Sequence, residues 1–243
     1  TDVEAHKLMS VESVIEQAKN AKMNGSSRLC MGAAWREVRD NKDFDNVIEM
    51  VQAVNDLDME VCCTLGMMNE DQAKRLKNAG LFAYNHNLDT SADFYDDVIS
   101  TREYEDRLNT IDNARKAGIS VCSGGIIGMG EAVEDRIGLL MSYMNMETPP
   151  ESIPINALVA VEGTPMAEQK PIEQWEMIRM VATTRIAFPK SVVRLSAGRT
   201  KMNMEGQALC FMAGASSIFA GDKLLTTPNP EFNEDKAMFD ILG

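Results

Sequence analysis

The sequence predicts an α/β fold, a (β/α)8 barrel of the TIM type of which about seven strands are present. Strand-like and helix-period segments alternate along the whole chain, and each strand is adjacent to a helix, as in parallel βα units. The 243 residues come close to the ~250 that such a barrel typically takes. No linker or low-complexity segment divides the sequence, so residues 1–243 are expected to form a single domain. A flavodoxin-like open sheet is the alternative fold, although seven units would be many for it.

The first expected element is a helix, because apolar residues from Val11 to Ala18 have helical spacing and Asn24-Gly25 supplies a stop. Seven strands are then expected, at 28–31, 60–65, 81–85, 119–122, 153–159, 192–195 and 217–219. Six helices are expected among them, at 44–51, 69–80, 108–118, 137–144, 175–189 and 204–213. Since no strand precedes the first helix, we expect the first βα unit of the barrel to be missing from the N-terminus.

The composition excludes several classes of protein. The net charge of −13 argues against a nonspecific nucleic-acid binder, and no apolar run is long enough to span a membrane. Two histidines cannot build a His₃ zinc site. Five cysteines without the spacing of a disulfide framework indicate a reducing cytoplasm. The 18 methionines fall mostly at helical positions such as Met141, Met144 and Met180, which we interpret as core packing.

Three cysteines, Cys30, Cys62 and Cys122, lie near the ends of three expected strands, where the working face of a βα barrel is built. Each of them alone is explained as a small buried apolar residue. Their convergence instead favours the thiolate ligands of an iron–sulfur cluster, which normally takes four protein ligands. Side-chain alternation places Cys63 on the opposite face from Cys62, and Cys210 falls within a helix, so both are assigned to packing.

Polar residues follow the third expected strand, in the segment 84–89. Asn85 and Asn87 are either turn formers or, with donor and acceptor together, ligands for a neutral ureido or amide group. Asp89 has the acceptors to bind ribose hydroxyls. His86 has the chemistry of a general base, but no Ser or Cys elbow accompanies it, so a hydrolase is poorly supported.

The segment 124–131 is rich in glycine and lies at a strand-to-helix junction. There the backbone can approach a flat or anionic ligand, or simply make a tight turn. The complete G-x-G-x-x-G dinucleotide pattern is absent. Asn156 and Arg194 lie on the next two strands, and an arginine pairs by default with a carboxylate or phosphate.

At these residues the sequence resembles the biotin synthase family of radical S-adenosylmethionine enzymes, over nearly its whole length. The motifs that carry the resemblance are Cys30–Trp35, Tyr84–Ser91, Val121–Gly125, Pro154–Asn156, Val193–Arg199 and Leu224–Pro230. The family implies a sulfurtransferase of biotin biosynthesis, which inserts sulfur into dethiobiotin within a (β/α)8 barrel. It also implies a protein electron donor of the flavodoxin or ferredoxin type and a homodimer.

The resemblance also implies the site residues. The ligands of a [2Fe–2S] cluster that donates the sulfur would be Cys30, Cys62, Cys122 and Arg194. Residues near S-adenosylmethionine would be Asn87, Asp89, Arg107, Gly124, Ile126 and Gly128, with Arg107 facing the carboxylate of that cofactor. The ureido ring of the substrate would lie among Asn85, Asn87 and Asn156. Arginine as an iron ligand rests on the resemblance alone, since its guanidinium stays protonated.

One departure from the family matters. The C-x-x-x-C-x-x-C loop that binds the [4Fe–4S] cluster of these enzymes has no counterpart among the five cysteines. We therefore expect an N-terminally truncated fragment that does not turn over by itself. Two alternatives stay open: a related radical enzyme of the hydrogenase-maturation or methylornithine-forming type, or a non-catalytic barrel that binds a cluster or ligand.

Overall fold

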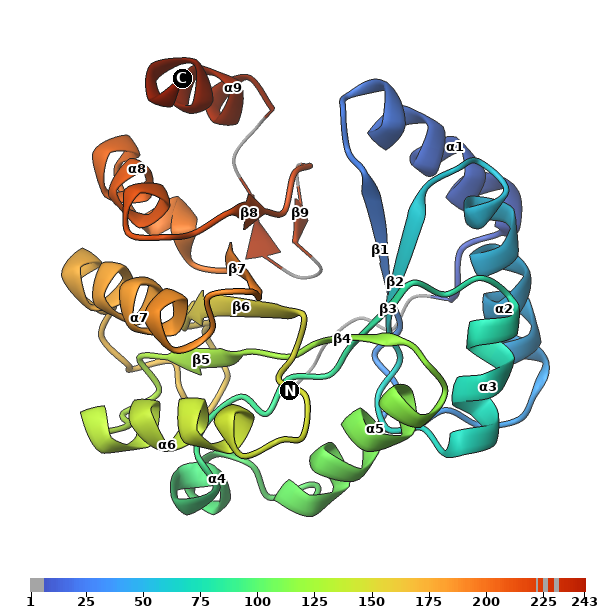
Figure 1. Cartoon of the computed structure of the whole chain (residues 1–243), viewed down its shortest axis with the longest axis horizontal. Helices are drawn as coiled ribbons and strands as arrows, with labels where there is room; N and C mark the ends of the chain where they lie inside the picture. Colours follow the sequence, from blue (N-terminus) through green and yellow to red (C-terminus); the bar gives the residue numbers. More distant parts are fainter. Residues whose placement is uncertain (1–6, 222, 225–226, 230–231) are drawn as a thin grey trace. The chain divides into compact units, whose positions relative to one another are not determined.

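The computed structural model describes residues 7–221, 223–224, 227–229 and 232–243. The chain divides into two compact units. We call residues 2–86 and 105–122 the N-terminal unit, and residues 87–104 and 123–243 the C-terminal unit. Each unit is built from parallel strands and the helices that connect them (Figure 1).

The N-terminal unit contains four adjacent parallel strands in chain order. They are β1 (Arg28–Gly32), β2 (Glu60–Thr64), β3 (Ala83–Asn85) and β4 (Ser120–Cys122). Its helices are α1 (Val11–Met23), α2 (Lys42–Asn55), α3 (Glu70–Asn78) and α5 (Tyr104–Lys116). Figure 1 shows α1, α2 and α3 along one face of these strands. The register places Cys30 opposite Cys62, and Asn85 opposite Cys122.

Side-chain caps define where the helices of the N-terminal unit begin. The Asn41 side chain accepts a hydrogen bond from the Phe44 backbone N–H at 3.1 Å, at the start of α2. Asn69 and Gln72 form a reciprocal capping box at the start of α3. The sequence predicts Asn69 as the start of that helix, and the structure confirms it.

The C-terminal unit contains a second run of parallel strands. They are β5 (Gly125–Ile127), β6 (Ser152–Ala157), β7 (Val192–Leu195) and β8 (Ser217–Ile218). A short antiparallel pair follows, β9 (Lys223–Leu224) and β10 (Thr227–Pro228). The helices are α4 (Ala92–Val98), α6 (Val133–Met144), α7 (Gln174–Ala187), the 3₁₀ turn η1 (Arg199–Lys201), α8 (Met204–Met212) and α9 (Phe232–Leu242).

The seven expected strands are all present, as β1 to β4 and β6 to β8. The short elements β5, α4, β9, β10 and α9 are additions that the sequence pattern does not reveal. Of the expected motif at 224–230, Leu225, Thr226 and Pro230 lie outside the described residues. Within the described chain, no helix is both long and apolar enough to cross a membrane. The single domain over 1–243 stays a prediction.

The methionines are only partly packed as predicted. Met180 is buried on α7, but Met141 is 45% exposed and Met144 is 51% exposed on α6. The core-facing side of α6 is made by Leu139, Leu140 and Tyr143. The packing prediction is wrong for Met141 and Met144, because α6 carries apolar residues on both of its faces.

Candidate cluster and cofactor sites

Three cysteines come together in the N-terminal unit. Cys30 on β1 and Cys62 on β2 face one another in register, and their thiols interact by a hydrogen bond. Cys122, at the end of β4, is close enough to Cys62 to affect its charge. Cys62 and Cys122 are buried, whereas Cys30 is exposed. The structure therefore groups the three cysteines that the sequence singles out.

The electrostatics of this group favour neutral thiols. The hydrogen bond with Cys30 raises the pKa of the Cys62 thiol well above its ordinary value, and burial and the charges of neighbouring cysteines raise it further. Thiolates packed in this way need a nearby cation to compensate their charge, and bound iron supplies that charge. Burial also raises the pKa of Cys63, and it raises the pKa of Cys210, within α8, to about 12.

The geometry differs from that of a site for a single ion. In the described part of the chain, no three His, Cys, Asp or Glu side chains are grouped as the ligands of one metal ion. A [2Fe–2S] cluster contains two irons and normally takes four protein ligands, so the three thiols would supply only part of its ligand set. The assignment of the three thiols to a [2Fe–2S] cluster therefore stays a prediction.

Two polar side chains lie beside the thiols. The Asn85 amide donates from Nδ2 to Cys122 Sγ at 3.3 Å. The Thr64 hydroxyl, at the end of β2, donates to Asn85 Oδ1 at 3.3 Å. Sequence reasoning missed Thr64, because threonine is common in strands and nothing in its spacing marks it.

The loop after β1 is held against the loop after β2. Gly66 has a φ of +82°, and a Cβ there would lie 2.4 Å from the Trp35 carbonyl oxygen, so only glycine fits. The buried Tyr84 hydroxyl donates to the Gly66 carbonyl at 2.6 Å. This contact connects β3 to the loop that follows β2.

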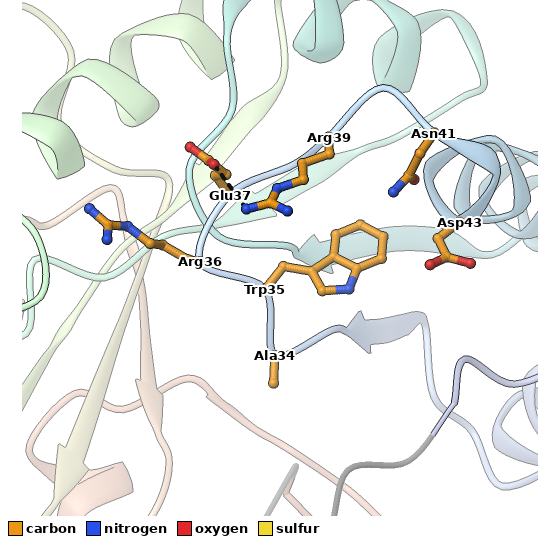
Figure 2. A pocket seen from close by; sticks show the side chains of 7 residues that line it. All are labelled: Ala34, Trp35, Arg36, Glu37, Arg39, Asn41 and Asp43. Carbon is orange, nitrogen blue, oxygen red and sulfur yellow. Dashed lines mark ion pairs between the residues drawn. The ribbon is translucent and has the colours of Figure 1, made fainter.

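The same loop lines a cavity of about 320 Å³ (Figure 2). In Figure 2 the Trp35 indole and the Arg39 guanidinium lie on one side of the loop, and Arg36 extends to the other. The lining residues are Ala34, Trp35, Arg36, Glu37, Arg39, Asn41 and Asp43. Two arginines balance two carboxylates, and none of the sequence-predicted site residues lines this cavity.

In the C-terminal unit, the segment 87–89 pairs with the glycine-rich segment. The Gly124 N–H donates to the Asn87 side chain at 3.1 Å, and the Ile126 N–H donates to the Asp89 carbonyl at 2.8 Å. Asp89 has a φ of +69°, which is uncommon for a residue other than glycine. The structure therefore brings together Asn87, Asp89, Gly124 and Ile126, four residues predicted to lie near the cofactor.

Glu131 fixes the far end of the glycine-rich segment. Its carboxylate is 2% exposed and accepts from the N–H groups of Gly128 at 2.8 Å and Met129 at 2.7 Å. Arg136 on α6 donates to the same carboxylate at 2.8 Å and also pairs with Glu176 on α7 at 2.5 Å. Glu131 thus holds the shape of the loop, a role that the glycine pattern alone does not reveal.

Asn156 and Arg194 also lie in the C-terminal unit. The Asn156 amide donates to the Gly125 carbonyl at 2.9 Å and accepts from the Ala197 N–H at 3.2 Å. The buried Arg194 donates from Nε to the Ser217 hydroxyl at 3.2 Å, and its guanidinium lies 4.6 Å from the centre of the Phe219 ring. Arg107 is buried on α5 of the N-terminal unit. Ligand sets that combine residues of both units stay predictions.

Comparisons with known proteins define the class of this chain. Residues 1–142 match the family model of the Radical SAM superfamily, and residues 154–243 match that of the Biotin and Thiamin Synthesis associated domain. A crystal structure of methylornithine synthase is similar in fold, with a TM-score of 0.83 and 19% identity over 100% of this chain and 74% of that one. The FeFe-hydrogenase maturase HydG of Carboxydothermus hydrogenoformans has a TM-score of 0.80 and 17% identity. That match covers 98% of this chain and 59% of HydG. These likenesses confirm the predicted radical SAM barrel fold, and at this identity they show the fold alone.

Sequence relatives identify the family. The biotin synthase of Flavobacterium johnsoniae is 68% identical over 100% of this chain and 67% of its own length. The biotin synthase of Myxococcus xanthus is 60% identical over 100% of this chain and 70% of its own length. The mitochondrial biotin synthase of Arabidopsis thaliana is 59% identical over 100% of this chain and 65% of its own length. The chain therefore belongs to the biotin synthase family, and it spans about two thirds of the length of these relatives.

Membership in this family confirms the predicted enzyme class and its place in biotin biosynthesis. The family also implies the use of S-adenosylmethionine and iron–sulfur clusters. The hydrogenase-maturation and methylornithine-forming alternatives match in fold but not in sequence, which decides between them and biotin synthase.

Proposed function

We propose that this chain carries the sulfur-donating part of a biotin synthase, which converts dethiobiotin to biotin. The observation that carries the proposal is the grouping of Cys30, Cys62 and Cys122 on adjacent strands of a chain from this family. Cys62 and Cys122 are buried, so two of the three proposed thiol ligands are shielded from water.

The ligands that we propose for a [2Fe–2S] cluster are Cys30, Cys62, Cys122 and Arg194. When bound, the cluster supplies the sulfide that enters the substrate. The three thiols hold iron as thiolates, and the strand register keeps Cys30 and Cys62 opposite one another. For Arg194 the support is its burial together with the family resemblance.

We propose that S-adenosylmethionine lies against the glycine-rich segment, near Asn87, Asp89, Gly124, Ile126 and Gly128. The support is the backbone pairing of 87–89 with 124–126, and the fixed turn at Gly128. Glycines there let the backbone approach a flat ring closely. Arg107 would pair with the carboxylate of the cofactor, as the resemblance implies.

The amides of Asn85, Asn87 and Asn156 are proposed to bind the ureido ring of dethiobiotin. An amide has two N–H groups and two carbonyl lone pairs. In Asn156, one N–H and one carbonyl lone pair bond to the backbone, and these bonds fix the orientation of the amide. We propose that its second N–H and second lone pair bind the ligand. Neutral donors and acceptors of this kind match a neutral ureido group.

Four further proposals come from the family and not from the geometry. Turnover needs a [4Fe–4S] cluster, whose C-x-x-x-C-x-x-C ligands are absent from these 243 residues, so this chain alone is inactive. An electron donor of the flavodoxin or ferredoxin type supplies reducing equivalents, and the protein forms a homodimer. It works in the cytoplasm, a reducing compartment that suits thiol ligands.

Anaerobic reconstitution with iron and sulfide tests the cluster. The chain is expected to develop the visible absorption of a [2Fe–2S] cluster, and Cys122→Ala is expected to lose it. Cys210→Ala is the matched control, since Cys210 lies in α8 of the other unit, and it is expected to keep the full spectrum. A Cys122→Ala protein with an intact [2Fe–2S] spectrum would contradict the ligand assignment.

A further inference from the structure

The pairing of Asn85 with Cys122 assigns a second task to Asn85. We propose that Thr64 and Asn85 form a directed hydrogen-bond relay that positions the Cys122 sulfur as an iron ligand and raises the reduction potential of the cluster. This inference rests on the proposed [2Fe–2S] cluster, and it makes Thr64 a positioning residue of the site.

The strand register builds the relay. Asn85 and Cys122 are direct partners in the parallel pairing of β3 with β4. Thr64 is the last residue of β2, the neighbour of β3 on its other side. Residues that pair in register on adjacent strands project to the same face of a sheet. The three side chains therefore form a line across three strand ends, joined by contacts of 3.3 Å each.

The direction of each hydrogen bond follows from the chemistry of the sulfur. A thiolate bound to iron has no proton, so Cys122 can only accept, and the Asn85 NH₂ group must face it. The carbonyl oxygen of Asn85 then faces Thr64, whose hydroxyl must donate. Both bonds run in this direction in the structure. Loss of the Thr64 hydroxyl removes the donor that favours this orientation of the Asn85 amide.

A hydrogen bond to a ligand sulfur withdraws electron density from it and favours the reduced cluster. Hydrogen bonds to cluster sulfurs are among the factors that set the reduction potentials of iron–sulfur proteins.

The test is the midpoint potential of the reconstituted chain, measured by anaerobic spectroelectrochemical titration. Because the C-x-x-x-C-x-x-C ligands are absent, no [4Fe–4S] signal overlaps that of the [2Fe–2S] cluster. We expect Thr64→Val to shift the potential to more negative values and to change the Fe–S(Cys) stretching bands in the resonance Raman spectrum. Thr64→Ser keeps a hydroxyl and is expected to restore both.

Thr110→Val is the matched control. The Thr110 hydroxyl donates to the Asp106 carbonyl at 2.8 Å within α5 of the same unit, so this variant removes an equivalent group outside the relay. It is expected to keep the wild-type potential. Asn85→Asp, which replaces the donor by a carboxylate, is expected to give a larger negative shift than Thr64→Val, and it provides the test if Thr64→Val fails to fold.

The possible results separate the two proposals. A wild-type potential in Thr64→Val or in Asn85→Asp, with the cluster intact, overturns the relay and leaves the cluster assignment standing. A wild-type chain that assembles no [2Fe–2S] cluster overturns both.

Discussion

The two units hold their site residues by different means. In the N-terminal unit, the neutral Asn85 amide donates to the Cys122 sulfur at 3.3 Å and accepts from the neutral Thr64 hydroxyl at 3.3 Å. In the C-terminal unit, the glycine-rich loop is held by the ionised Glu131, over distances of 2.7 to 2.8 Å. Neutral groups therefore contact a cysteine proposed to bind iron, whereas the loop proposed to shape a cofactor site is held by a charged side chain.

The largest expected effect lies in the C-terminal unit, at Arg199. This arginine is 1% exposed and donates to both oxygens of Asp235 on α9, at 2.6 and 2.8 Å. Arg199→Met leaves the buried Asp235 carboxylate without its cation, so we expect a loss of about 3–5 kcal/mol in the free energy of unfolding. Urea denaturation of the purified chain measures it. Arg179→Met, at a side chain that is 70% exposed, is the control and should change stability by less than about 1 kcal/mol.

The second prediction concerns Glu131, whose carboxylate holds the glycine-rich segment in place. Glu131→Gln removes the charge that binds Gly128, Met129 and Arg136, and it should cost about 1.5–3 kcal/mol, the range of hydrogen bonds to a charged group. Amide hydrogen exchange at Gly128 and Met129 should accelerate more than exchange elsewhere in the unit. Unchanged exchange at these two amides would show that the loop keeps its shape without Glu131.

A neutral contact in the N-terminal unit should matter less. Tyr84→Phe removes the hydroxyl that donates to the Gly66 carbonyl, and the expected loss is about 1–2 kcal/mol, measured by urea denaturation. Phenylalanine keeps the ring, so the packing around it is preserved. A loss as large as that of Arg199→Met would contradict the contrast between the two units.

The smallest effect is a pH dependence at Glu176. Its hydrogen bond with Arg136 lowers the pKa of the Glu176 carboxyl below its ordinary value. A lowered pKa in the folded state adds stability above the unfolded-state pKa of 4.5, and this stability is lost as pH falls through the lower folded-state pKa. The stability difference between wild type and Glu176→Gln should therefore be present at pH 6, at less than about 1 kcal/mol, and should shrink toward pH 3. A difference that grows in acid would contradict the sign of this pKa shift.

Much of the fold is predictable from the sequence, and for a physical reason. Buried parallel strands appear in the sequence as short apolar runs between helices that have clear capping residues. The pattern therefore locates each strand along the chain, although it does not fix the residues at which the strand begins and ends. The three residues of β5 merge with the glycine-rich segment, which hides them. On α6, the exposed residues Ile137, Met141 and Met144 have helical spacing just as the buried ones do, so periodicity does not show that Met141 and Met144 face outward.

The residues of the candidate site also differ in how far the sequence predicts them. Cys30, Cys62 and Cys122 are predictable, because cysteine is rare and strand ends converge in this fold. Thr64, Glu131 and Arg199 are common residue types whose importance comes only from their three-dimensional partners. Sequence patterns thus find the residues with unusual chemistry and miss those that orient them.

The three thiols differ in their access to solvent, with Cys30 exposed and Cys62 and Cys122 buried. If these three thiols bind iron as proposed, an iron ion arriving from solution would meet Cys30 first. An oxidant in solution would likewise reach the Cys30 sulfur before those of Cys62 and Cys122. Cys30, the outermost of the proposed ligands, would therefore be the first to react both when the cluster is assembled and when it is oxidised.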